Sequence, residues 1–180
     1  MRLSSTIERS QSPALRAGSV RVSRQVETTP ERVFDAWLHA EAARTFLFAG
    51  GTSNAISSQM DTRVGGRFRI VRRRDDGEVE YSGEYLEIDR PHRLVFSLFV
   101  ERYAQRDDRI VVEIAPVEGA SLLVLTHEHS LPSPAERARI EGGWATALDE
   151  LAALCSESTS RTPLHWLRAP ALVTWDPDFV

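Results

Sequence analysis

The chain has 180 residues with 22 basic and 26 acidic side chains, which gives a net charge of −4 with neutral histidines. Every basic residue is arginine, so chemistry that needs a lysine amine, such as Schiff-base formation, is excluded. The length suits one domain, and an acidic chain lacks the positive surface that a phosphate backbone attracts, so nucleic acid is not an expected partner.

The next features are those that bear on the cellular compartment and the domain organisation. Cys155 has no second cysteine with which to form an internal disulfide, and no apolar run resembles a signal peptide core or a membrane span, so we expect a cytoplasmic protein. Residues 1–18 predict a flexible leader and 19–156 the folded domain. Residues 157–180 place Trp166 and Trp175 among prolines, which predicts an irregular arm that packs onto another surface.

The first elements predicted along the chain are one strand and two short helices. Valines alternate with polar residues over 20–26, which is typical of a strand. Thr29 is a suitable N-cap and Pro30 a suitable first helical residue, and the apolar residues that follow recur every three or four positions. A second short helix is expected over about 41–48, before the glycines at 50 and 51.

From residue 54 onward the apolar pattern changes to a period of two. This alternation predicts six strands, at 54–61, 66–74, 79–88, 93–101, 109–115 and 121–129. The turns between them are short, so the strands should form an antiparallel meander. Ser133 and Glu136 then form a capping box at the start of a long last helix, whose apolar side is marked by Ile140, Trp144, Leu148, Leu151 and Cys155.

An arginine-rich stretch, 67–74, stands next to the strongest turn signal of the chain. If Asp76-Gly77 forms a two-residue hairpin turn, Arg73 lies opposite Glu80 and Arg69 opposite Glu84. The stretch is then a solvated outer face offset by glutamates, not a nucleic-acid site.

Arg72 is the exception, because the same register points it inward beside Tyr81. An arginine in the interior requires an anionic partner, so we expect it either to meet Glu87 or to bind a ligand carboxylate or phosphate.

Two histidines raise the question of a metal site. His127 and His129 are two residues apart on one predicted strand, so both point to the same inner face. A zinc site needs a third ligand, so we predict no metal and favour a hydrogen-bonding role. No combination of nucleophile and base is found, so no catalytic residue is assigned, although a general-base role for His127 with Glu87 or Tyr85 stays open.

The order of the predicted elements is similar to that of the helix-grip proteins of the START and birch-pollen-allergen-like superfamily. The chain also resembles the family named after the C-terminal domain of the activator of heat-shock protein 90 ATPase, over about residues 20–155. The local sequences that carry this resemblance are Glu31–Trp37, Val64–Phe68, Gly83–Phe96, Leu125–His127 and Gly143–Trp144. The resemblance implies an α+β fold, in which a curved antiparallel sheet of six to seven strands wraps around the long C-terminal helix and encloses a hydrophobic cavity.

The candidate ligand-binding residues are those that this fold would place around the cavity. They are Trp37, Phe68, Ile70, Arg72, Tyr81, Tyr85, Glu87, Phe96, Leu98, Val112, His127, Trp144 and Leu148. Plain core packing is the alternative interpretation for the apolar members. Gly142 and Gly143 inside the last helix suggest either a close approach of another backbone or a bend that leaves space below Trp144.

These observations favour a protein that binds a small hydrophobic or amphipathic molecule, without a cofactor, over an enzyme. The resemblance implies two alternatives. One is a chaperone-associated interaction protein with a role in stress response, and the other is a polyketide cyclase or hydrolase-like enzyme that uses the same pocket. Leu122 and Val124 lie on the outer face of the last strand, which predicts a cover formed by the aromatic arm or by a second copy in a homodimer.

Overall fold

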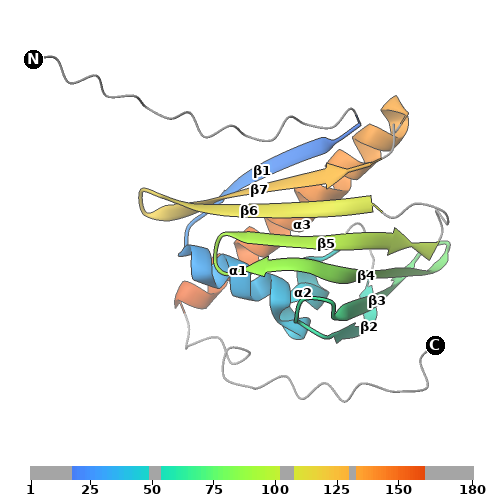
Figure 1. Ribbon diagram of the computed structural model, residues 1–180, viewed down its shortest axis with the longest axis horizontal. Helices are drawn as coiled ribbons and strands as arrows, with labels where there is room; N and C mark the ends of the chain where they lie inside the picture. The colour runs from blue at the N-terminus through green and yellow to red at the C-terminus, as the bar shows by residue number, and fades with distance from the viewer. Residues whose placement is uncertain (1–17, 49–53, 102–107, 130–132, 161–180) are drawn as a thin grey trace, which may run out of the picture.

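A computed structural model of the protein describes residues 18–48, 54–101, 108–129 and 133–160 (Figure 1). The elements occur in the order β1 (Val20–Val26), α1 (Pro30–Leu38), α2 (Ala40–Phe46), β2 (Asn54–Met60), β3 (Arg67–Arg74), β4 (Gly77–Asp89), β5 (Arg93–Val100), β6 (Asp108–Val117), β7 (Ala120–Glu128) and α3 (Pro134–Ser160). Every strand and helix predicted from the sequence is present. The predicted strand bounds lie within two residues of the observed ones.

The strands form one seven-stranded antiparallel sheet in the order β1-β7-β6-β5-β4-β3-β2. Strands β2 to β7 form a meander with β2 at one edge of the sheet. Strand β1 pairs with β7 and forms the other edge. Figure 1 shows all three helices on one face of this sheet, with α3 crossing behind the strands. The α+β helix-grip architecture is therefore confirmed, and the expected six to seven strands are seven. We call the sheet face that is turned to the helices the inner face.

The last helix begins and packs as its sequence predicts. The Ser133 hydroxyl accepts a hydrogen bond from the Glu136 amide at 3.2 Å, and the Glu136 carboxylate accepts one from the Ser133 amide at 2.8 Å. The residues of its apolar stripe from Trp144 to Cys155 are buried against the sheet and the first two helices. The helix continues to Ser160, past the domain boundary expected at 156.

The first helix is correctly placed, but its expected cap is only partly present. Thr29 has the extended backbone of an N-cap and Pro30 is the first helical residue, yet the Thr29 hydroxyl makes no capping hydrogen bond. Val33, Phe34 and Trp37 are buried, so the helix is fixed by its apolar face.

The β3–β4 hairpin has a different register from the predicted one. Arg74 pairs with Gly77, so the turn residues are Asp75 and Asp76, and every pair is shifted by two. Gly77, with φ of +122°, is the first residue of β4 and not part of the turn. Because side chains alternate with a period of two, a shift by two changes the partners but keeps each residue on its predicted face.

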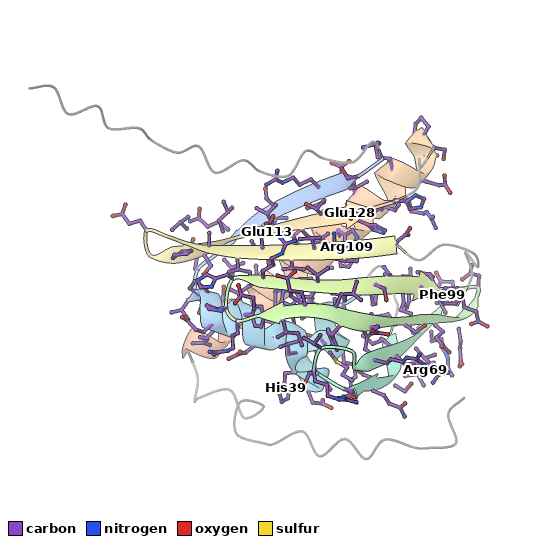
Figure 2. All side chains as sticks on the ribbon, viewed as in Figure 1. His39, Arg69, Phe99, Arg109, Glu113 and Glu128 are labelled. Carbon is purple, nitrogen blue, oxygen red and sulfur yellow. The ribbon has the colours of Figure 1, made fainter. Side chains whose placement is uncertain are left out.

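The outer face carries the charged rows that the sequence indicates. Arg69 pairs with Glu80 at 2.6 Å and Arg73 with Glu78 at 3.1 Å, instead of the partners expected from the other register. Across the middle of the sheet, Arg109, Glu113 and Glu128 rise from β6 and β7 on the side away from the helices (Figure 2). These exposed pairs contribute little to the free energy of unfolding, but they keep this face solvated.

Three expectations about coverage and compartment remain predictions. Leu122 is 38% exposed on the outer face. The arm expected to cover it falls at 161–180, outside the described residues, as do 1–17 of the leader. Whether a homodimer covers this face is likewise untested. No helix in the described part of the chain is long and apolar enough to cross a membrane.

The two glycines of α3 do not accommodate a neighbouring backbone. A Cβ atom added at Gly142 or at Gly143 would meet nothing within 4 Å. The expectation of a close backbone approach is therefore wrong, and both positions are exposed to solvent.

Candidate functional site

The inner face brings the candidate residues together. All of them except Glu87 are buried between the sheet and the helices. The strands supply most of them, while Trp37 comes from α1, and Trp144 and Leu148 come from α3. Because the strands alternate and the helices repeat every three to four residues, residues far apart in the sequence share this one interior.

Four aromatic rings form the centre of this interior. The Trp37 ring packs edge-on against Phe46, with ring centroids 5.0 Å apart. It also lies 6.2 Å from the Phe96 ring and 6.5 Å from the Trp144 ring. These distances are typical of favourable aromatic pairs. They join α1, α2, β5 and α3 in one cluster, which we call the aromatic centre.

Phe48 extends the aromatic centre toward the far end of the sheet. Its ring is stacked on Tyr81 with centroids 4.2 Å apart, and lies 5.7 Å from the Trp144 ring. The sequence analysis missed Phe48 because it follows the end of α2, where no periodicity assigns a side to it. Its positive φ of 58° is a further sign of a residue held by tertiary packing.

A third group of rings lies on β3, β4 and β5. Phe68 is 5.7 Å from Tyr85 and 5.5 Å from Phe96. Burial raises the pKa of the Tyr85 hydroxyl far above its ordinary value, with a smaller contribution from the charge of Asp61. Tyr85 therefore stays protonated at physiological pH and is a hydrogen-bond donor, not a base.

A buried polar cluster lies at one side of the aromatic centre. The Trp144 indole nitrogen donates to Nδ1 of His127 at 2.9 Å, and Nε2 of His127 lies 3.0 Å from the Asp108 carboxylate. Since an indole N–H can only donate, Nδ1 must accept, and the proton is on Nε2, facing Asp108. His129 also lies near Asp108, with Nε2 3.8 Å from the same oxygen. We call these residues the Trp144–His127–Asp108 relay.

The relay confirms the hydrogen-bonding role of His127 and limits its chemistry. Both ring nitrogens have partners, so neither is available to accept a proton from a substrate. The sequence analysis missed Asp108, because this residue falls in the turn between two of the predicted strands, 93–101 and 109–115. Within the described residues, no group of three His, Cys, Asp or Glu side chains could hold a metal ion.

Arg72 is inward and buried as expected, but its partners are different. It is 2% exposed, and its guanidinium donates to the backbone carbonyls of Leu47 at 2.8 Å and Arg44 at 2.7 Å. These carbonyls belong to the last turn of α2, where a positive charge is favourable. Burial lowers the pKa of Arg72, and the nearby Tyr81 partly opposes this effect. The expected pairing with Glu87 or a ligand anion is replaced by a cap on a helix end.

Glu87 is the one candidate that lies on the wrong face. Strand β4 has a bulge at Leu86, because Tyr85 pairs with Phe96 while Glu87 pairs with Val95. The extra residue inverts the alternation, so Glu87 points outward and pairs with Arg93 at 3.2 Å. No feature of the sequence marks this bulge, and Glu87 is withdrawn from the site.

Arg74 occupies the end of the interior next to Phe48. Its guanidinium donates to the Tyr81 hydroxyl at 2.6 Å and to the Phe48 carbonyl at 3.3 Å. The Tyr81 hydroxyl is therefore an acceptor in this arrangement. Arg74 was not a candidate in the sequence analysis, because it was assigned to the hairpin end.

Among the described residues, Arg32 on α1 has two buried guanidinium nitrogens, Nε and Nη2, without a hydrogen-bond partner, and its charge acts on Cys155. Two neutral buried polar atoms on this interior also have no hydrogen-bond partner. One is the indole nitrogen of Trp37, a residue that is 1% exposed, and the other is the hydroxyl oxygen of Ser58. Ser58 lies on β2 directly opposite Ile70, so it shares the inner face with the core residues of β3. The sequence analysis missed Ser58, because a serine in an alternating strand is most often on the solvated side.

Comparison with known proteins places this arrangement in a family. The chain has the fold of protein CV1439 from Chromobacterium violaceum, with a TM-score of 0.66 and 24% identity over 77% of this chain and 96% of that one. It is also similar to the AHSA1-like protein from Aeromonas hydrophila, with a TM-score of 0.64 and 21% identity over 82% and 98% of the two chains. CalU16 from Micromonospora echinospora shares the fold with a TM-score of 0.59 and 21% identity over 79% of each chain.

Identity at this level establishes the fold alone, and no curated protein matches the chain. The family model described as activator of Hsp90 ATPase homolog 1-like protein matches residues 27–156. That range holds both helices before the meander, the meander itself and the buried part of α3. The chain belongs to the family of activator of Hsp90 ATPase homolog 1-like proteins.

Proposed function

We propose that this protein binds a small apolar or amphipathic molecule between the inner face of the sheet and α3. The observation that carries the proposal is the composition of the interior, which is almost entirely apolar, contains a cluster of aromatic rings and has a few polar groups at fixed positions. Such a mixture is typical of small-molecule sites, where apolar surface supplies affinity and a few polar atoms set orientation. The candidate residues for contact are the aromatic centre, Ile70, Leu98, Val112 and Leu148.

The experiment is titration of the full chain with N-phenyl-1-naphthylamine, a neutral dye whose fluorescence rises in apolar surroundings. Leu98→Trp adds bulk on the inner face, and Leu122→Trp makes the same change on the exposed outer face. We expect saturable binding to the parent chain and to Leu122→Trp, and at least about tenfold weaker binding to Leu98→Trp. Circular dichroism checks that both variants fold.

Absence of saturable binding, together with native mass spectra that contain no co-purified molecule, would remove the proposal. Equal binding to both tryptophan variants would place the dye on another surface.

A second candidate function is favoured by the family description, which names the Hsp90 ATPase. It predicts that the protein raises the rate of ATP hydrolysis by that chaperone. A coupled ATPase assay at saturating protein measures this rate, and an unchanged rate would eliminate the candidate. The enzymatic alternative has no such support, because the relay occupies both nitrogens of His127.

A further inference from the structure

The two unpartnered polar atoms of the interior carry information about the ligand. A buried N–H or O–H without a partner loses its hydrogen bonds to water and gains none in return, so such groups are rare in folded proteins. In this interior, the Trp37 indole nitrogen is such a group, and its nearest described rings offer it no acceptor atom. Trp144, its neighbour, already donates its own N–H to His127.

Ser58 provides the second, independent observation. Its hydroxyl oxygen is buried and has no partner, although it lies on a different element from Trp37. Both residues face the interior that the aromatic centre fills, Trp37 from the helix layer and Ser58 from the sheet. The unmet hydrogen-bonding capacity is therefore on both sides of that interior.

The charged groups nearest to the aromatic centre already have partners. Arg72 donates to the carbonyls at the end of α2, and Arg74 donates to Tyr81 and the Phe48 carbonyl. The Asp108 carboxylate faces His127. Arg32 has buried nitrogens without partners, but its charge acts on Cys155, which is eleven residues, or about 16 Å, along α3 from Trp144. The groups left for a ligand beside the aromatic centre are thus neutral donors, and a carboxylate or phosphate buried among them would lack a cation.

We infer that the ligand is a neutral molecule with a hydrogen-bond acceptor oxygen, such as a ketone, ester or amide carbonyl, which accepts from the Trp37 indole N–H, the Ser58 hydroxyl or both. This inference rests on the proposed function and deepens it. A fatty-acid anion is excluded as the preferred ligand by the same argument.

The test compares three probes of nearly the same shape on the full chain. These are 2-acetonaphthone, which is neutral and has a carbonyl, 2-ethylnaphthalene, which has no acceptor, and 2-naphthoate, which is an anion. We expect 2-acetonaphthone to bind about three- to tenfold more tightly than 2-ethylnaphthalene, the effect of a neutral hydrogen bond. The anion should bind at least about tenfold more weakly than the ketone.

Variants of the two donor residues test which protein atoms cause the preference for the ketone. Trp37→Phe removes the indole N–H. The ratio of the dissociation constants of 2-ethylnaphthalene and 2-acetonaphthone should then fall to near one. Ser58→Ala removes only a hydroxyl and should reduce the preference in part. The matched control is Ser57→Ala, the same change on the adjacent residue, which pairs with Val71 on the outer face and should keep the preference.

Nuclear magnetic resonance measures a chemical shift that would not change if Trp37 had only a structural role. The Trp37 indole proton, assigned by its loss in Trp37→Phe, should shift downfield with 2-acetonaphthone and much less with 2-ethylnaphthalene. Equal affinities of these two probes, or a preference that survives both Trp37→Phe and Ser58→Ala, would overturn the inference while the proposed function stands. Binding of none of the three probes would overturn both.

Discussion

Some charged residues in the interior of this protein are stabilised by hydrogen bonds to backbone groups. Arg72 is the clearest example, because its guanidinium is buried and caps the last carbonyls of α2. Replacing Arg72 by an apolar residue leaves those carbonyls buried without donors. The free-energy cost of these unpaired carbonyls is larger than the net stabilisation that the original hydrogen bonds provide.

We therefore predict that Arg72→Met destabilises the protein by about 2–4 kcal/mol. The matched control is Arg73→Met, the next residue on the exposed outer face, which should change the free energy of unfolding by less than about 0.5 kcal/mol. Urea unfolding followed by circular dichroism measures both. Similar values for the two variants would contradict the structural role of Arg72.

Gly83 is required by a close approach and not by a turn. A Cβ atom at this position would lie 1.9 Å from the Ser97 carbonyl oxygen and 2.8 Å from the Phe68 ring. Gly83→Ala should therefore destabilise the protein by at least about 3 kcal/mol, because a backbone atom must move. Thermal unfolding tests this, and a melting temperature within a degree of the parent value would refute the observed packing.

Cys155 shows how burial controls reactivity. Burial raises its pKa from 9.0 to about 11, with the charge of Arg32 acting in the opposite direction. At pH 8 the thiolate fraction is then on the order of one part in a thousand. We predict no reaction of the folded protein with Ellman's reagent over minutes, and complete reaction of the single thiol after unfolding in urea. Rapid labelling of the folded protein would show that this thiol is accessible.

At the scale of elements, the helices are fixed by burial more than by local preference. Helix α1 lacks its side-chain cap, and α3 contains adjacent glycines, yet both form because one side of each is buried against the sheet. An exposed ion pair between Asp35 of α1 and Arg90, at 2.7 Å, adds only a modest contribution.

The glycines of α3 give a prediction at this scale. Since no atom lies within 4 Å of an added Cβ, Gly142→Ala should stabilise the protein by about 0.5–1 kcal/mol through the lower flexibility of the unfolded chain. Gly143→Ala should have the same effect in the absence of ligand. Urea midpoints measure this change, and a destabilised Gly142→Ala would show that the position is more crowded than it is here.

At the scale of the whole molecule, the sheet and the three helices enclose one apolar interior with a cluster of aromatic rings at its centre. If a neutral ligand occupies that interior in the folded state alone, it stabilises folding by mass action. We predict that 2-acetonaphthone at about 100 times its dissociation constant raises the melting temperature by about 5–10 °C. Leu98→Trp should show no such rise, and a parent chain that is equally unaffected would argue against an enclosed site.

The fold could be predicted almost completely from the sequence, and the site only in part. Alternation and helical spacing are local, so they identified the strands, the capping box and the buried side of α3. They also placed Arg72 inward despite a wrong register, because a shift of two preserves the face. They failed at Glu87, where the bulge at Leu86 changes the period without any local signal.

What the sequence by itself determined is therefore the identity of the elements and the direction of most side chains. Only the tertiary structure decided the partners of the inward polar groups. Arg72 bonds to carbonyls more than twenty residues away, and His127 is held between Asp108 and Trp144. The Trp37 N–H has no acceptor among the residues that the structure describes. The physical reason is that a hydrogen bond depends on distances of a few tenths of an ångström between segments remote in the chain, and these are set by packing.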